Sequence, residues 1–207
     1  MSKVYVDHHE TIYCGAEFNS ANEITLPAGY ESSEYKERVK HVEWEHIVPV
    51  ESFGRTFIEW RNGAPLCVNK EGEAYKGQRC VNRVSREYRQ MQADLYNLHP
   101  AIGAVKAMRG NYEFALLPSE KSDLGSCQMK VANKKAEPPI EARGRIARAY
   151  LYMDQRYPRY RMSKQQRKLM LEWNKLYPIT GWECKRARRI KTIQGNSNPV
   201  LKPQCGS

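Results

Sequence analysis

Glu45 and His46 are the adjacent residues of this sequence best suited to acid and base chemistry. A neutral imidazole has a reference pKa of about 6.5, so it can accept a proton near neutral pH. A carboxylate beside it can serve the same site. The alternative is a hydrogen-bonded structural histidine whose tautomer is fixed by the carboxylate. The pair alone leaves both interpretations open, and His8, His9, His41 and His99 have no stronger context.

The elements around the pair decide whether both side chains can reach one site. Segment 41–48 has a short β-like pattern and is followed by Pro49 and Gly54. Neighbouring side chains on a strand point to opposite faces. We therefore expect the chain to bend close to this pair.

Helices are expected in the rest of the chain. Ser163 and Thr180 each start a capping-box sequence, which predicts two helices that end before Pro178 and at Gly195. Apolar spacing predicts two more helices, over 141–152 and over about 85–96. The mixture indicates an α+β fold that is mainly helical toward its C-terminus. We find no internal repeat or strong linker, so we expect one domain over 1–207.

The charge of the chain is strongly positive and unevenly distributed. Lysine and arginine number 34 against 23 acidic residues, a net charge of +11, and residues 143–191 hold fifteen of the basic residues and three of the acidic ones. Such an excess favours a polyanionic partner over ordinary solvated helix faces. We expect nucleic-acid contacts from Arg186, Arg188 and Arg189. No apolar run approaches the roughly 18 residues of a spanning helix, which excludes an integral membrane protein of that kind.

The six cysteines, Cys14, Cys67, Cys80, Cys127, Cys184 and Cys205, lack the usual zinc-site spacings. Disulfides are the favoured interpretation, and they indicate an oxidising compartment; six unrelated buried thiols are the alternative. Residues 1–11 have no apolar signal region, so we expect a mature chain whose leader was removed.

Several motifs occur together in a fixed order. The most specific are Trp44-Glu45-His46-Ile47-Val48-Pro49, Phe53-Gly54, Asp94-Leu95-Tyr96-Asn97-Leu98-His99-Pro100 and Arg109-Gly110-Asn111-Tyr112. Others are Tyr13-Cys14-Gly15, Cys127-Gln128-Met129, Glu137-Pro138-Pro139, Arg145-Ile146-Ala147-Arg148, Trp173-Asn174-Lys175, Trp182-Glu183-Cys184 and Gln194-Gly195-Asn196. Over nearly the whole chain, this series resembles the bacterial endonuclease I family of non-specific periplasmic or secreted nucleases. The resemblance implies a ββα-metal (His-Me) finger at about 41–100 and a basic helical part at about 140–195.

The resemblance also implies roles for single residues. His46 matches the general base that activates water, and Glu45 and Asn97 match the ligands of one Mg²⁺ ion, for which other divalent ions can substitute. Hard oxygen ligands suit magnesium and leave positions for phosphate oxygens. We expect neither ligand to be a core-packing residue. His99 is the next candidate base.

An arginine of the family braces the phosphate from a glycine-rich basic stretch ahead of a cysteine. Arg79, in Lys76-Gly77-Gln78-Arg79-Cys80, matches best, with Arg61 second, although counting from His46 reaches Pro65. The resemblance further implies the disulfides Cys67–Cys80, Cys14–Cys127 and Cys184–Cys205. Family members often carry Cys-Gly-Cys near the start, where Ala16 replaces the second cysteine here. Residues 26–30 lack a further cysteine that the family would place nearby, and the two losses together suggest that one bridge was lost as a pair. Six cysteines allow fifteen pairings.

These observations predict a magnesium-dependent, sequence-non-specific endonuclease. It would cleave double- and single-stranded DNA and RNA to 5′-phosphate products, act outside the cytoplasm as a monomer and have no membrane partner. A non-catalytic nucleic-acid-binding protein and a cationic protein acting on anionic envelopes are the competing hypotheses.

Overall fold

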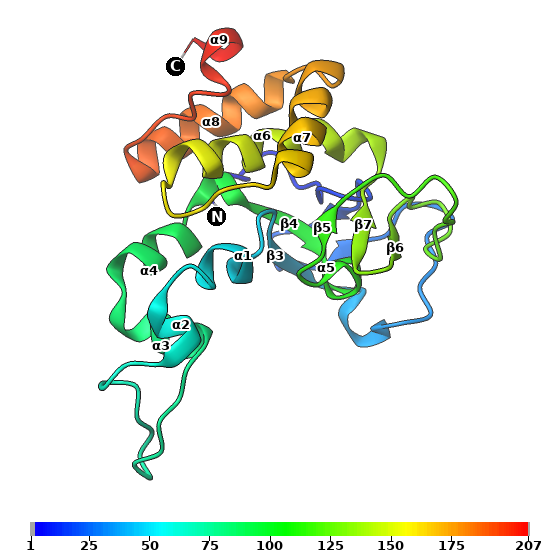
Figure 1. The fold of residues 1–207 in the computed structure, drawn as a ribbon. Helices are drawn as coiled ribbons and strands as arrows, with labels where there is room; N and C mark the ends of the chain where they lie inside the picture. The colour runs from blue at the N-terminus through cyan, green and yellow to red at the C-terminus, as the bar shows by residue number, and fades with distance from the viewer. Residues whose placement is uncertain (1–2, 207) are drawn as a thin grey trace.

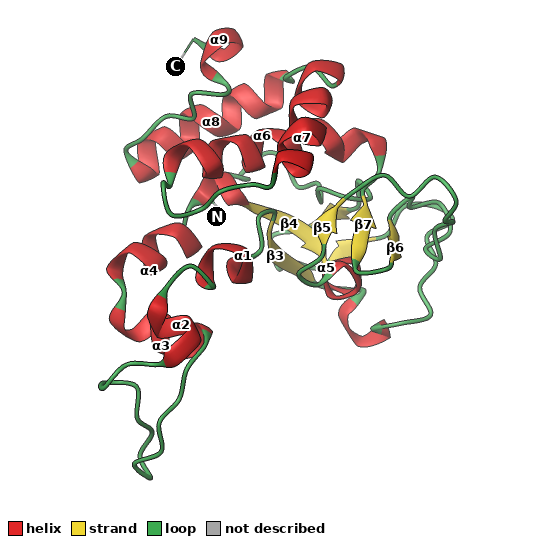
Figure 2. Ribbon diagram, viewed as in Figure 1, coloured by secondary structure: helices red, strands yellow, loops and turns green. Residues whose placement is uncertain are grey.

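The strands of the protein are short, and β3 to β7 (within residues 42–137) lie below the long helices in Figure 2. The computed structural model describes residues 3–206, and in that range three small sheets form. In the first two, β1 (Glu17–Phe18) pairs with β2 (Ile24–Thr25), and β3 (Val42–His46) pairs antiparallel with β4 (Leu98–Ile102). The third sheet has the order β5-β7-β6, from β5 (Glu113–Phe114), β6 (Lys130–Ala132) and β7 (Lys135–Glu137).

Helices make up most of the remaining regular structure. In chain order they are α1 (Val50–Gly54), α2 (Ile58–Asn62), α3 (Gln78–Val84), α4 (Arg86–Gln92), α5 (Gly103–Arg109), α6 (Ile140–Arg156), α7 (Lys164–Leu176), α8 (Gly181–Gln194) and α9 (Lys202–Cys205), with the 3-10 turns η1 (Lys36–Arg38) and η2 (Leu95–Asn97). The α+β class and the helical C-terminal part are as predicted from the sequence.

Figure 1 shows how these elements are arranged. The long helices α6, α7 and α8 form one layer over the β3–β4 pair, and α2 and α3 project from the opposite side as an arm. Helix α5 directly follows β4, whereas α1 to α4 and η2 lie between β3 and β4 in the chain. No helix among residues 3–206 has the length and apolar character needed to cross a bilayer.

The helix ends follow the local sequence. Thr180 forms a complete capping box with Glu183, and Gly195 adopts the left-handed conformation that ends α8. Ser163 caps α7 by accepting from the amide of Gln166 at 3.1 Å. In the described part of the chain the Gln166 side chain does not complete a second capping box, and its amide nitrogen is buried without a partner.

The helix predicted over about 85–96 is interrupted. Helix α4 ends at Gln92, and Asp94 adopts an extended conformation and accepts from the amide of Tyr96 at 3.0 Å, which starts η2. An aspartate that bonds the backbone two residues ahead competes with helix continuation. The interruption leaves the Gln92 carbonyl in the last turn of α4, where a carbonyl has no helical partner.

Candidate active site

The end of β3 is where the predicted base and the predicted metal ligands come together. Strand β3 ends at His46, and the chain turns through Pro49 into α1, so the bend expected from the sequence is present. The antiparallel register sets Glu45 opposite His99. Beyond it, the amide of Ile47 donates to the carbonyl of Asn97 at 2.9 Å. The pairing therefore brings Asn97 beside the turn that follows Glu45 and His46.

The side chain of Asn97 is fully buried and forms hydrogen bonds with both the amide and the carbonyl of Val48. Its Oδ1 accepts from the Val48 amide at 2.7 Å, and its Nδ2 donates to the Val48 carbonyl at 2.9 Å. These two bonds fix the orientation of the side-chain amide, because only Nδ2 can donate to a carbonyl. An amide oxygen has two lone pairs, so Oδ1 keeps one acceptor position after binding Val48.

The Glu45 carboxylate is also buried. Its Oε1 accepts from the Tyr13 hydroxyl at 2.7 Å and from Nη1 of Arg109 at 2.9 Å. Within residues 3–206, Oε2 has no hydrogen-bond partner. Burial raises the pKa of Glu45, and the charge of Arg109 and the Tyr13 bond oppose that shift only in part. A cation bound at Oε2 would favour the ionised carboxylate further.

These two oxygens are the donors available for a metal ion. A carboxylate oxygen of Glu45 and the amide oxygen of Asn97 are hard ligands of the kind that Mg²⁺ prefers. The described residues contain no cluster of three or more His, Cys, Asp or Glu side chains arranged for a metal. The residues present thus fit a hard ion that keeps several waters. The expectation that neither ligand packs in the core is wrong, since both side chains are buried.

Arg109 ties α5 to the end of β3. Besides Glu45, its guanidinium donates to the carbonyls of His46 at 2.8 Å and Ile47 at 2.7 Å, and Nε donates to the carbonyl of Tyr112 at 3.1 Å. The side chain is almost completely buried. Arg109 therefore holds both the proposed metal-binding carboxylate and the backbone of the proposed base.

The imidazole of His46 is oriented by a backbone carbonyl. Nε2 lies 2.8 Å from the carbonyl oxygen of Gln92. A carbonyl can only accept, so Nε2 carries the hydrogen and Nδ1 of the neutral ring carries the lone pair. Burial lowers the pKa of His46 below its usual value of 6.5, and the Gln92 bond opposes this in part. The imidazole is therefore mainly neutral at pH 7.

The two arginines expected near the phosphate lie on the arm. Arg79 is exposed in the first turn of α3, with its guanidinium 4.3 Å from the centre of the Tyr75 ring. Arg61 is exposed at the end of α2 and donates to the carbonyl of Arg55 at 3.2 Å. No hydrogen bond within residues 3–206 joins either side chain to Glu45, His46 or Asn97. Arg79 and Arg61 remain candidates for contacts with the phosphates of a bound nucleic acid.

The predicted nucleic-acid contact at Arg186 needs correction. Arg186 is buried, with Nε donating to the Tyr5 hydroxyl at 2.9 Å and Nη2 to the carbonyls of Leu95 at 2.6 Å and Leu98 at 2.8 Å. It supports the segment that carries Asn97 and is not exposed to a ligand.

Arg189 and Arg188 differ from Arg186 and from each other. Arg189 binds the Val4 carbonyl at 2.9 Å and forms an ion pair with Asp7 at 2.6 Å, so its guanidinium is already engaged. Arg188 is exposed and has no ion-pair partner in the described part of the chain. Of the three predicted contacts, Arg188 alone presents an unengaged charge to solvent.

The disulfides agree with the pairing implied by the family resemblance. Cys14 bonds Cys127, Cys67 bonds Cys80 and Cys184 bonds Cys205. The first fixes the segment next to Tyr13, whose hydroxyl binds Glu45.

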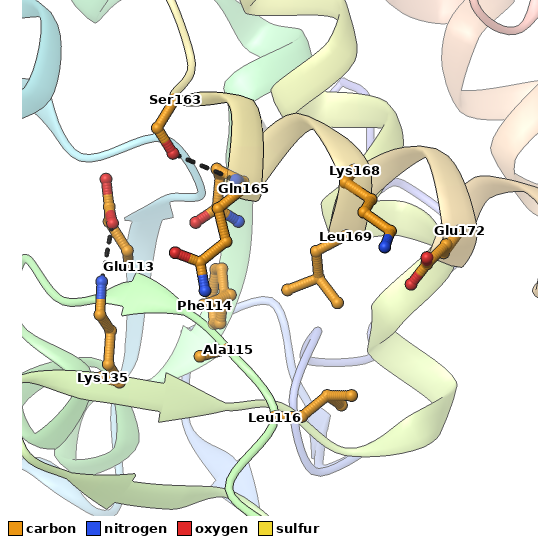
Figure 3. Close-up of a pocket in the computed structure, with 11 residues that line it drawn as sticks. Glu113, Phe114, Ala115, Leu116, Lys135, Ser163, Gln165, Lys168, Leu169 and Glu172 are labelled. Carbon is orange, nitrogen blue, oxygen red and sulfur yellow. Dashed lines mark hydrogen bonds and ion pairs between the residues drawn. The ribbon is translucent and has the colours of Figure 1, made fainter.

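A separate hollow of about 320 Å³ lies between β5 and α7 (Figure 3). Lys168 and Glu172 of α7 line it, and its carboxylate on β5, Glu113, pairs with Lys135. None of the predicted site residues lines this hollow. We therefore place the candidate active site at the end of β3.

Sequence reasoning gave no role to Tyr13, Gln92 or Arg109. Tyr13 and Arg109 stand in the matched motifs, which is the signal that could have identified them. Gln92 contributes only its backbone carbonyl. Every residue has such a group, so the residue type at position 92 could not indicate the contact.

Comparison with known proteins agrees with the geometry. The family model described as Endonuclease I matches residues 6–205. An extracellular deoxyribonuclease of Aeromonas hydrophila is 38% identical, covering 99% of this chain and 87% of that protein. A periplasmic deoxyribonuclease of the same species is 38% identical over 98% of this chain and 82% of its own length. Endonuclease-1 of Buchnera aphidicola (subsp. Acyrthosiphon pisum) is 32% identical over 98% of this chain and 78% of its own.

The extracellular and periplasmic placement of these relatives agrees with the three disulfides, and the protein acts outside the cytoplasm. The family match covers nearly every described residue, including the β3–β4 pair, the arm helices α2 and α3, and the helical layer α6 to α8. The chain belongs to the endonuclease I family and is a nuclease that hydrolyses phosphodiester bonds.

Proposed function

We propose that this protein is a magnesium-dependent, sequence-non-specific endonuclease that uses His46 as its general base. The observation that carries the proposal is the 2.8 Å contact between His46 Nε2 and the Gln92 carbonyl. It leaves the basic nitrogen of a neutral imidazole free, in a site that also holds a carboxylate and an amide oxygen.

The chain's own residues divide the work. Nδ1 of His46 takes a proton from a water molecule, whose oxygen attacks phosphorus as the bond to the 3′ oxygen breaks. The phosphate then stays on the 5′ side, and the 3′ oxygen leaves as a hydroxyl once protonated. Glu45 and Asn97 would hold Mg²⁺. When bound, the ion supplies positive charge to the scissile phosphate and the leaving oxygen.

The neighbouring residues position these groups or bind substrate. Arg109 and Tyr13 hold Oε1 of Glu45 and leave Oε2 available. We assign phosphate contacts to the exposed Arg79, with Arg61 and Arg188 as further contacts. An arginine binds phosphate oxygens through its planar fork of N–H donors.

The proposed substrates follow from this kind of contact. The relatives named deoxyribonucleases support DNA as the substrate. Phosphate contacts carry no sequence information, so we extend the proposal to double- and single-stranded DNA of any sequence and to RNA. We propose that a monomer of this domain acts without a membrane partner.

Plasmid cleavage with Mg²⁺ and with a chelator tests the proposal. The protein should nick and linearise plasmid only with the metal, and Glu45→Gln should remove the activity. Glu43→Gln is the matched control, because Glu43 lies two residues away on β3 and pairs with Arg38 and Lys106 instead. Cleavage that persists in chelator, or that Glu45→Gln leaves unchanged, would contradict the metal site.

A further inference from the structure

Asp94 is a buried carboxylate without a positively charged partner among the described residues. Four donors saturate it instead. Oδ2 accepts from the hydroxyls of Tyr152 at 2.7 Å and Tyr157 at 2.6 Å, and Oδ1 accepts from Nε2 of Gln194 and the amide of Tyr96, both at 3.0 Å. The donors come from α6, the residue that follows it, α8 and η2.

This cluster fixes the backbone of η2 from several sides. The Gln194 side chain also accepts from the amide of Leu95 at 2.8 Å, and the amide of Asn97 donates to the carbonyl of Asp94 at 3.0 Å. The Tyr96 hydroxyl donates to the carbonyl of Ala187 in α8 at 3.2 Å. The helical layer thus holds η2 through Asp94 together with direct bonds from α8, which include those of Arg186 to the carbonyls of Leu95 and Leu98.

Asp94 lies between two residues that contribute groups to the candidate active site. Asn97, at the end of η2, provides the proposed amide ligand. Gln92, two residues before Asp94, provides the carbonyl that orients His46. Burying an ionised carboxylate is costly unless hydrogen bonds satisfy it. A neutral side chain could cap the 3-10 turn at lower cost. Capping alone therefore does not explain why a carboxylate stands at position 94.

We propose that Asp94 is a positioning residue that sets the metal-binding geometry of Asn97 through η2. This inference rests on the proposed function, because it takes Asn97 as a metal ligand. Asp94 acts through Tyr152, Tyr157 and Gln194 and does not itself touch substrate or metal. Residues that support metal ligands commonly change metal affinity or activity 10- to 100-fold when they are replaced.

The test compares Asp94→Asn with the parent protein in Mn²⁺ affinity, measured by electron paramagnetic resonance, and in DNA affinity, measured in chelator. We expect Mn²⁺ affinity to fall by about 10- to 100-fold, and DNA affinity to stay within about twofold because the exposed arginines are untouched. Asp154→Asn is the matched control. Asp154 is also a buried carboxylate, but it lies on α6 and binds Arg167 and the amide of Met162 rather than η2.

Thermal unfolding and a second variant separate positioning from mere stability. If Asp94→Asn is folded at the assay temperature and binds Mn²⁺ as the parent does, the positioning role is overturned. Should it fail to fold, Tyr157→Phe removes a single donor to Oδ2 and is expected to weaken Mn²⁺ binding several-fold. Tyr88→Phe is its control, since the buried Tyr88 hydroxyl has no partner among residues 3–206. Equal Mn²⁺ affinity in Tyr157→Phe, Tyr88→Phe and the parent also overturns the inference.

Glu45→Gln, measured in the same way, distinguishes the two proposals. If it loses Mn²⁺ affinity while Asp94→Asn does not, the metal site stands and the role of Asp94 is wrong. If Glu45→Gln keeps the affinity of the parent, the proposed metal site is wrong, and the role of Asp94 is overturned with it.

Discussion

The end of β3 and the basic segment 143–191 are both conspicuous in the sequence, but the structure agrees with the two sequence signals to different extents. At the end of β3, the motif residues Glu45, His46 and Asn97 meet in one place, and a buried arginine holds two of them. In the basic segment, two of the three arginines predicted to contact DNA, Arg186 and Arg189, are engaged with the protein itself. Five arginines of the basic segment are paired with carboxylates: Arg143 with Glu137, Arg148 with Glu183, Arg159 with Glu87, Arg167 with Asp154 and Arg189 with Asp7.

The difference shows what each sequence signal contains. A motif specifies residue types at positions that the fold must bring together. A net charge counts ionised groups and does not say which of them remain exposed. The +11 charge of the chain therefore favours a polyanionic partner, but the surface that meets the partner has to be identified residue by residue.

The largest loss of stability is expected from Arg109→Leu. This change leaves the buried Glu45 carboxylate without its positive partner and also removes the donors to the carbonyls of His46 and Ile47. Breaking a buried pair typically costs about 3–5 kcal/mol. Urea unfolding of the variant and the parent measures the loss, with Arg79→Leu as the exposed control. A difference below about 1 kcal/mol would show that Arg109 does not support the site.

A smaller loss is expected from Arg186→Leu. The carbonyls of Leu95 and Leu98 lose a donor in a buried region, and an unsatisfied buried group costs about 1–3 kcal/mol. Arg188→Leu, two residues along the same helix, should leave the unfolding midpoint unchanged. Equal midpoints for the two variants would contradict the contrast between buried and exposed arginines in this segment.

The pH dependence of cleavage provides a third test. Because burial lowers the pKa of His46 below 6.5, more than half of the imidazole is neutral at pH 6.5. The single-turnover rate at saturating Mg²⁺ should therefore stay above half of its plateau value at pH 6.5 and fall further at lower pH. A rate already halved at pH 6.5 would mean that the pKa of the base is not lowered.

The smallest expected effect concerns salt. Each phosphate contact contributes about −0.9 to the slope of log affinity against log salt for duplex DNA. Arg79→Ala and Arg188→Ala should each make this slope less steep by about one, and Arg189→Ala should leave it unchanged because that guanidinium is paired with Asp7. Fluorescence anisotropy in chelator at several salt concentrations measures the slopes. An altered slope for Arg189→Ala alone would reverse the assignment.

Much of the frame could be predicted from the sequence because its signals are local. The strand around Glu45, the cap at Thr180 and the end of α8 at Gly195 depend on residues within one or two turns. The motifs also pointed to Asn97, far along the chain from Glu45.

Other features of the site could not be predicted, because they depend on contacts between distant segments or on the backbone. The interruption of α4 depends on how Asp94 is satisfied by α6 and α8. The orientation of His46 depends on a carbonyl that any residue at position 92 would supply. The burial of Arg186 depends on the packing of α8 against η2.

The central claim is that His46 supplies the base while other groups bind the nucleic acid. Its most direct test measures plasmid cleavage and duplex affinity for His46→Ala at fixed salt and Mg²⁺, with His41→Ala, an exposed histidine just before β3, as the control. General-base assistance is worth roughly 10²–10⁴ in rate, so His46→Ala should cleave that much more slowly and bind DNA as tightly as the parent does. Cleavage by His46→Ala at nearly the parent rate would contradict the account.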